Sequence, residues 1–192
     1  MWLPWVFSSG WASGVSAYLA VLQLGLLDRV FDIGGVPDTL MRTDVMIFAG
    51  CMYAIEFVTD KIPLVDTAWD AVHTVIRPTI GVLLGLLMSG DADTLGQAAA
   101  AATGGVTAFL SHGTKASVRL ALNASPEPVT NITASIGEDV TVASVITVLV
   151  VAPWVAASVA AALLVLGLTV VWHIQKRVRR LIAARRLRRS VP

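Results

Sequence analysis

Long apolar segments alternate with short polar ones along the chain. Apolar stretches cover 11–30, about 43–59, a run that begins within 56–78 and ends at Met88, about 95–110, and 140–174. A membrane span needs about 20 mostly apolar residues, and the last stretch is long enough for two. Pro153 divides it, either as a kink or as a turn between two helices. With a turn there, the pattern predicts an all-α, polytopic bundle of six transmembrane helices.

Polar elbows that contain proline interrupt two parts of this pattern in a similar way. Residues 43–88 and 98–151 each hold an apolar span, an elbow and a second span. Paired interruptions of this kind often indicate a transporter site built from both halves of a repeat. The plan suggests a two-fold internal repeat of helical hairpins, although any hairpin of two spans also needs a polar elbow.

The composition supports membrane insertion. Of the 192 residues, 56% are hydrophobic and 14% are charged, and the mean hydropathy is +0.75. Soluble domains carry about 25% charged residues, so a chain this apolar is typical of an integral membrane protein.

The basic residues are concentrated at one end of the chain. The formal net charge is +1, but eight of the fourteen Lys and Arg residues lie in the last seventeen positions, 176–192. Basic clusters beside a span stay in the cytoplasm. The pattern therefore predicts a bundle over 1–175, a basic amphipathic cytoplasmic tail over 176–192 and, with six spans, both termini inside. Such a tail binds the anionic head groups of the lipid bilayer. No nucleic-acid partner is expected, because the basic residues form no folded face.

Ionisable side chains gather in one stretch between two apolar runs, EFVTDKIPLVDTAWDAVHTVIRP at 56–78. It contains Glu56, Asp60, Lys61, Asp66, Asp70, His73 and Arg77. On a helix the last four, spaced three or four apart, share one face. Charges at bilayer depth are costly and persist where they pair or line a cavity. This stretch is the predicted site.

A second polar segment follows the fourth apolar run. It supplies His112, Lys115, Arg119, Asn123 and Glu127. Because charges of opposite sign cluster in a membrane interior, we expect both segments to meet in one central polar site that binds an ion or substrate.

Three kinds of chemistry fit these residues. The carboxylates could pair with Lys and Arg for purely structural reasons. Asp66, Asp70 and His73 could instead hold a divalent cation, and the carboxylates could relay protons, as in an ion-binding or transport centre. The spacing of Asp66 and Asp70 also resembles the carboxylate pairs with which membrane prenyl and phospholipid transferases hold Mg²⁺, although a second aspartate-rich motif is absent from the sequence.

The distribution of polar residues favours transport over catalysis. They are spread over two elbows and the adjoining helix ends, as a path through a bundle requires, whereas no P-loop, GxSxG or HExxH sequence occurs. The sequence predicts a small membrane transporter or channel that moves an ion or small charged solute, with proton coupling through the carboxylates. The alternative is a membrane-embedded, metal-dependent enzyme that acts on a phosphorylated lipid.

Cys51 is the only cysteine, which excludes a disulfide within the chain and a cysteine-based metal site. Its apolar neighbours predict a small buried residue. Small residues such as Gly14, Ser16 and Gly25 permit close helix packing and would allow a homo-oligomer.

The two polar segments also resemble a known family. The stretch 56–78, together with SHGTKASVRLALNASPEPVTN and the Gly-Glu-Asp sequence at 137–139, is similar to a widespread bacterial family of small integral membrane proteins catalogued only as a domain of unknown function. The resemblance covers about residues 11–175 and leaves out the basic tail. It implies several spans and a polar centre formed by these motifs, but no activity. We expect the protein to lie in the bacterial cytoplasmic (inner) membrane.

Overall fold

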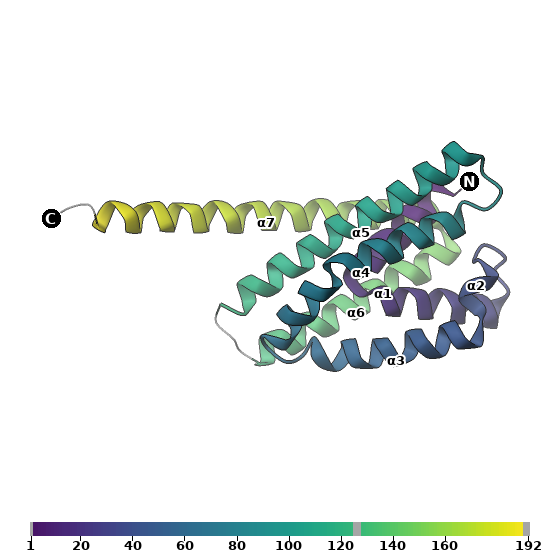
Figure 1. Cartoon of the computed structure of the whole chain (residues 1–192), viewed down its shortest axis with the longest axis horizontal. Helices are drawn as coiled ribbons and strands as arrows, with labels where there is room; N and C mark the ends of the chain where they lie inside the picture. Colours follow the sequence, from purple (N-terminus) through teal and green to yellow (C-terminus); the bar gives the residue numbers. More distant parts are fainter. Residues whose placement is uncertain (1, 125–127, 190–192) are drawn as a thin grey trace.

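The computed structural model describes residues 2–124 and 128–189, and within these ranges all regular structure is helical. There the helices are α1 (Leu3–Phe31), α2 (Asp38–Met41), α3 (Thr43–Thr59), α4 (Val65–Met88), α5 (Thr94–Leu122), α6 (Pro128–Val151) and α7 (Pro153–Arg189). The long helices run back and forth along one axis (Figure 1). The prediction of an all-helical bundle is confirmed for the described residues.

Four helices are long and apolar enough to cross a membrane in the part of the chain that the structure describes, namely α1, α4, α6 and α7. By contrast, α3 has only 17 residues, and α5 is rich in Ala, Gly and Thr. The four helices support an integral membrane protein. They do not confirm six spans, nor does the fold confirm an internal repeat.

Two helices extend beyond the predicted apolar segments. Helix α5 continues past Leu110 through the second polar segment to Leu122, and α6 begins at Pro128 instead of Val140. Hydropathy places a helix end where polar residues begin, but here several of those residues face other helices and have partners there. At Pro153 the chain turns, and α7 runs back along α6 (Figure 1).

Helix α1 is broken near its middle and doubles back (Figure 1). Ser16 has φ −148° and ψ 93°, outside the helical region. A Cβ atom on Gly35, beyond the end of α1, would lie 3.0 Å from the Trp5 indole, which places the two ends of α1 close together. The break at Ser16 thus lies inside the apolar run over 11–30 that the hydropathy pattern predicts as one span, and whether this run crosses the membrane once stays a prediction. The start of α1 and the far end of α7 lie at opposite ends of the molecule (Figure 1), and the expected placement of both termini in the cytoplasm stays a prediction.

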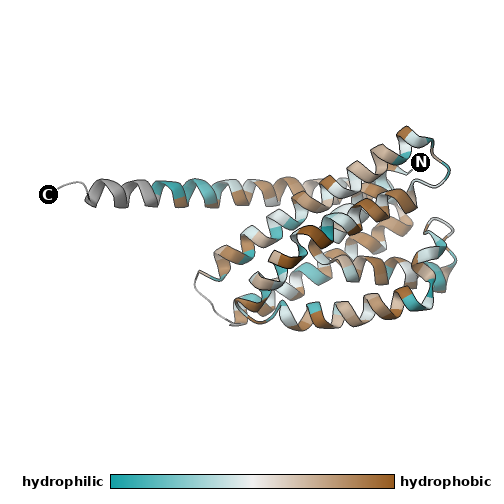
Figure 2. Ribbon diagram, in the orientation of Figure 1, coloured by the Kyte–Doolittle hydropathy of each residue, from teal (hydrophilic) through white to brown (hydrophobic). Residues whose placement is uncertain are grey.

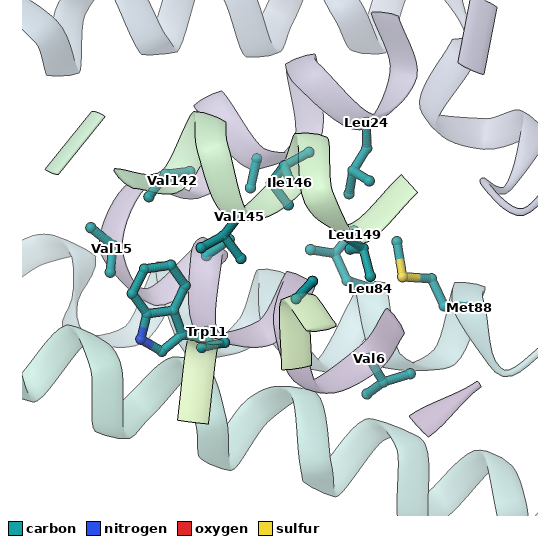
Figure 3. Packing of buried hydrophobic residues seen from close by; sticks show 14 of the residues in the cluster. Val6, Trp11, Val15, Leu24, Leu84, Met88, Val142, Val145, Ile146 and Leu149 are labelled. Atoms are coloured by element: carbon teal, nitrogen blue, oxygen red, sulfur yellow. The ribbon is translucent and has the colours of Figure 1, made fainter. Parts of the chain in front are cut away.

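The hydrophobic core lies toward the end of the bundle where α6 turns into α7. Figure 3 shows Val6 and Leu24 of α1 packed with Leu84 of α4 and with Ile146 and Leu149 of α6. All five side chains are almost completely buried. In a membrane such contacts stabilise the bundle through van der Waals packing. Burial adds no hydrophobic gain there, because lipid is as apolar as the core.

Helices α4 and α5 pack closely through small residues. A Cβ atom on Gly104 would overlap the carbonyl group of Gly81, and one on Gly85 would overlap the carbonyl group of Ala100. Small residues let two backbones approach in this way. As a result, the polar first half of α4 lies beside the polar second half of α5.

Two helices, α3 and α7, have many side chains that do not contact the rest of the bundle. In α3 only Ala49 and Glu56 are buried, and Cys51 is exposed. The expectation of a buried cysteine is wrong because α3 touches the bundle along a narrow face. Helix α7 changes from apolar to polar where it leaves the bundle near Lys176 (Figure 2). The helix continues without a break through the predicted boundary at 175, so the division into bundle and tail stays a prediction.

Candidate functional site

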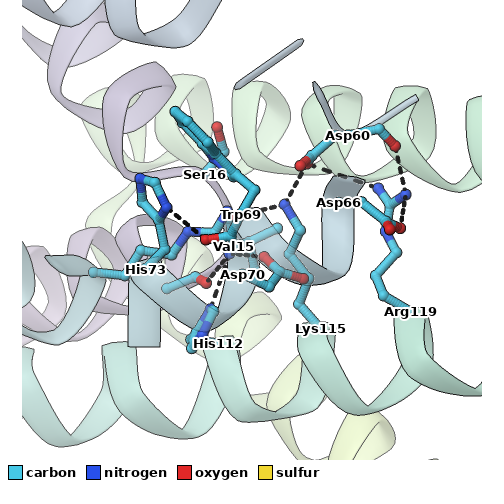
Figure 4. A network of polar contacts seen from close by, with 12 residues as sticks. Val15, Ser16, Asp60, Asp66, Trp69, Asp70, His73, His112, Lys115 and Arg119 are labelled. Carbon is cyan, nitrogen blue, oxygen red and sulfur yellow. Dashed lines mark hydrogen bonds and ion pairs between the residues drawn. The ribbon is translucent and has the colours of Figure 1, made fainter. Parts of the chain in front are cut away.

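The charged residues of both predicted segments meet between α3, α4, α5 and α6 (Figure 4). Each of seven is less than one tenth exposed: Glu56, Asp60, Asp66, Asp70, Arg77, Lys115 and Arg119. We call this set, with the less buried Glu138, the ionic cluster. It occupies the half of the bundle opposite the hydrophobic core.

Arg77 holds two carboxylates at the centre of the bundle. Its Nη2 lies 2.6 Å from Glu56 Oε1, and its Nη1 lies 3.1 Å from Asp70 Oδ1. The Ser16 hydroxyl donates to Glu56 Oε2 at 2.9 Å. We refer to Glu56, Arg77 and Asp70 as the central triad. Its members come from two helices and are anchored to the break in α1.

His112 extends the central triad toward α5. Arg77 Nη1 donates to His112 Nδ1 at 2.9 Å. Because a guanidinium can only donate, this ring nitrogen accepts and the imidazole is neutral. The proton then lies on Nε2, which faces Thr74 Oγ1 at 3.1 Å. The Thr74 hydroxyl in turn donates to the Asp70 carbonyl at 3.0 Å.

Lys115 and Arg119 of α5 join the α3–α4 turn to α6. Lys115 Nζ lies 2.6 Å from Asp60 Oδ2 and 3.4 Å from Glu138 Oε2. Arg119 donates two hydrogen bonds to the Glu138 carboxylate, at 2.6 and 3.1 Å, and one to the Asp60 carbonyl at 2.8 Å. Two parallel bonds between guanidinium and carboxylate fix both position and orientation.

Asp66 forms the end of the cluster, where α4 begins. Asn123 Nδ2 donates to Asp66 Oδ1 at 2.7 Å, and Asn131 Nδ2 donates to Oδ2 at 3.1 Å. Arg119 Nη1 lies 3.7 Å from the same Oδ2 atom. Both carboxylate oxygens therefore have donors, and the ionised form is well satisfied.

The break in α1 is held by two cations of the cluster. Lys115 Nζ donates to the Val15 carbonyl at 2.9 Å, and Arg77 Nη1 donates to the Gly14 carbonyl at 3.4 Å. Carbonyl groups that precede a helix end lack partners within the helix. Here cationic side chains of α4 and α5 supply the missing donors.

Asp60 and Lys61 lie in the turn between α3 and α4. Burial is the largest single influence and would raise the pKa of Asp60, but Lys115, Arg77 and Arg119 together outweigh it and hold that pKa below its ordinary value. Burial lowers the pKa of the Lys61 ammonium. Lys61 donates to the Phe57 carbonyl at 2.8 Å and to Ser135 Oγ at 3.3 Å, so it lies at the edge of the cluster.

The proposed metal ligands are not brought together. Asp66 is bound by Asn123 and Asn131, Asp70 by Arg77, and His73 lies between Tyr18 and Trp69. His73 Nδ1 donates to the Trp69 carbonyl at 2.8 Å, so its Nε2 accepts from the Tyr18 hydroxyl at 3.0 Å. Across 2–124 and 128–189, no three His, Cys, Asp or Glu side chains form a group that could hold a metal ion.

One predicted site residue, Glu127, lies outside the described residues. Conversely, Ser16 belongs to the site but was not predicted. Asn131 and Glu138 were not singled out as site residues, although both lie in motifs that the resemblance to a family implies form the polar centre. Glu138 had a recognisable signal, because a carboxylate within an apolar stretch is costly unless it has a partner. Ser16 carried no such signal, since it resembles its small neighbours in the sequence.

Comparison with known proteins gives one match. A family model described as "Domain of unknown function (DUF4126)" matches residues 3–173. This range confirms the resemblance to a family of that kind. No curated protein and no solved structure matches the chain.

Proposed function

This chain belongs to the DUF4126 family, and from its ionic cluster we propose that it is a membrane transporter or channel that moves an ion or small charged solute with proton coupling. The observation that carries the proposal is the break of α1 at Ser16, inside a group of buried charges. Transporters commonly build their sites from interrupted helices, whose unpaired backbone groups face the centre of the bundle.

Proton coupling is supported by the composition of the cluster. It contains five carboxylates, Glu56, Asp60, Asp66, Asp70 and Glu138, against three cations, Arg77, Lys115 and Arg119. Five negative and three positive charges leave a surplus of two negative charges. A surplus of this kind in a membrane interior is costly unless protons or other cations neutralise it.

A lateral cavity of about 400 Å³ leads to the cluster from one side. It is bordered by α1, α5, α6 and α7, with Lys115 and Glu138 among its polar residues and Trp11 and Leu164 among its apolar ones. The Glu138 side chain is 21% exposed, whereas that of Lys115 is only 3% exposed. A solute in this cavity would meet the ion pair directly.

We place the cytoplasm, in a bacterial inner membrane, at the end of the bundle where α7 emerges. The basic segment of α7, the α3–α4 turn and the end of α5 lie at this same end (Figure 1), and basic residues beside spans favour the cytoplasm. Anionic lipid head groups would then contact the exposed Lys176 and Arg179. Because α1 doubles back, its first residues would lie on the opposite side. Exposed small residues of α3 leave room for a homo-oligomer.

Flux into proteoliposomes tests the transport function. The purified protein should dissipate an imposed pH gradient, read with an entrapped pH-sensitive dye and with potassium and valinomycin clamping the membrane potential. Glu56→Gln should lower the rate at least about ten-fold, the factor that corresponds to ~1.4 kcal/mol. The matched control is Asp44→Asn, because this carboxylate of the same helix is exposed and remote from the cluster.

The enzyme alternative predicts a different result. If the protein moved no protons or ions, yet converted a phosphorylated lipid in a manner that Mg²⁺ supports and Asp70→Asn abolishes, the transporter proposal would be wrong. The product would be identified by mass spectrometry of the extracted lipids.

A further inference from the structure

The central triad holds one negative charge more than its cation can balance. Arg77 is fully buried and contacts both Glu56 and Asp70, whose side chains are 2% and 4% exposed. One guanidinium thus faces two carboxylates inside the bundle. Two like charges sharing one site cannot both ionise readily, so one of them favours its neutral form.

The hydrogen bonds distinguish the two carboxylates. Glu56 has a donor on each oxygen, Arg77 on Oε1 and Ser16 on Oε2. Asp70 has Arg77 on Oδ1, whereas its buried Oδ2 has no hydrogen-bond partner among the residues that the structure describes. Burying an ionised oxygen without a donor is unfavourable. The surplus proton therefore belongs on Asp70 rather than on Glu56.

A pocket between α4 and α5 reaches Asp70. Its volume is about 250 Å³, and besides Asp70 it is lined by the hydroxyl-bearing residues Thr67, Thr74 and Ser117. A buried water occupies about 30 Å³ and needs two or more polar partners, so the pocket has room for several. It lies along the first turns of α4, toward the end of the bundle that we assign to the cytoplasm.

The charged and titratable groups around Asp70 come from every neighbouring element. They are Glu56 of α3, Asp60 of the turn, His73 and Arg77 of α4, His112 and Lys115 of α5, and Glu138 of α6. Lys115 is already paired with Asp60 and Glu138. His112 is neutral because it accepts from Arg77. Apart from Arg77, which Asp70 shares with Glu56, no cation in this group is paired with Asp70.

We propose that Asp70 is the proton-binding residue of the transport site, and that its proton is exchanged with water through the pocket between α4 and α5. A hydronium ion in the pocket gives its proton to Oδ2, so that one of its O–H bonds breaks as the Oδ2–H bond forms and a water molecule is left. When Asp70 ionises, the Oδ2–H bond breaks and the proton passes to a water molecule of the pocket. The inference rests on the proposed function for its role in transport, but the protonation state itself can be measured without any flux.

Infrared spectroscopy of the full chain in lipid membranes provides the test. At neutral pH, with sodium-free buffer, the protein should show a protonated-carboxyl C=O band. Incorporation of [4-¹³C]aspartate by cell-free synthesis should move this band to lower frequency, because the carbonyl carbon becomes heavier. Asp70→Asn should remove it, whereas Asp44→Asn should leave it unchanged. Ser16→Ala should also leave its frequency unchanged, since Ser16 donates to Glu56 and not to Asp70.

Three outcomes would overturn the inference. The band could be absent, it could remain unmoved by the aspartate label, or it could shift in Ser16→Ala, which would place the proton on Glu56. A band that disappears when sodium replaces N-methylglucamine would identify Na⁺ as the neutralising cation instead. The aspartate label separates an aspartate from Glu56 in the unaltered chain. Asp70→Glu, which keeps a carboxyl group at this position, should retain the band but make it insensitive to the aspartate label, so the assignment to Asp70 does not depend on Asp70→Asn alone. A protein that shows the labelled band but moves no protons would contradict the proposed function alone.

Discussion

Arg119 illustrates how much depends on a single buried cation. Its guanidinium contacts the carboxylates of Glu138 and Asp66 and the carbonyls of Asp60 and Asn131. Removing one partner of a buried ion pair leaves uncompensated charge in the interior and typically costs about 3–5 kcal/mol. Arg119 thus links the α3–α4 turn to α6 through one side chain.

We expect Arg119→Gln to destabilise the protein strongly. The loss should be about 3–5 kcal/mol, because Glu138 and Asp66 would lose a shared cation. Thermal unfolding in detergent, followed by circular dichroism, would measure it. Arg42→Gln is the matched control, since the pair between Arg42 and Asp44 is exposed, with side chains 64% and 65% accessible. An equal effect of both substitutions would contradict a structural role for the cluster.

Helix α5 is the element on which both halves of the fold depend. Its first half packs on α4 through Gly104 and its neighbours, and its second half carries Lys115 and Arg119. Close approach along the small residues therefore positions the charged residues farther along the same helix. A change in the packing of α5 on α4 would therefore also displace Lys115 and Arg119 from their partners.

The same substitution at two glycines of α5 should have opposite effects. In Gly104→Ala the new methyl would overlap the Gly81 carbonyl, so we expect overpacking to cost about 1–3 kcal/mol. In Gly113→Ala nothing lies within 4 Å of the new Cβ atom, and helix propensity predicts a gain of up to about 1 kcal/mol. Thermal unfolding in detergent would compare the two. Similar midpoints would show that α4 and α5 are not closely packed.

The sequence predicted which residues share a face in the site better than it predicted where the helices begin and end. Spacing within 56–78 placed Asp66, Asp70, His73 and Arg77 on one helical face, and all four are buried in α4. The end of α5 and the start of α6 were misplaced, because a hydropathy pattern ends a membrane helix wherever polar residues begin. Asn131 and Glu138 lie inside α6, where Asp66 and Arg119 satisfy them.

The break in α1 could not have been predicted from local sequence. Ser16 lies among small and apolar residues that are compatible with a continuous helix. The donors that stabilise the break, Arg77 and Lys115, follow it by 63 positions from Gly14 and by 100 from Val15. Only the tertiary arrangement makes the broken form favourable. In the orientation that we propose, this single feature would place the N-terminal segment on the side opposite the basic end of α7.

For the whole molecule, the arrangement of α1 predicts that the start of α1 and the α4–α5 turn lie on one side of the membrane and the basic part of α7 on the other. Single cysteines placed at Leu3, Asp91 and Arg179, in a Cys51→Ala background, lie at exposed positions. We expect Leu3 and Asp91 to react with a membrane-impermeant maleimide from one side and Arg179 from the other. Reaction of Leu3 from the same side as Arg179 would instead support six straight spans.

The long separation between the α1 break and its partners also has a consequence for biosynthesis. When the segment up to Val15 leaves the ribosome, neither Arg77 nor Lys115 has been made, and the Gly14 and Val15 carbonyls have no donor from the cluster. We therefore expect the broken form of α1 to be stabilised only after α5 has been synthesised. The first helix would then reach its final shape only after the middle third of the chain has been translated.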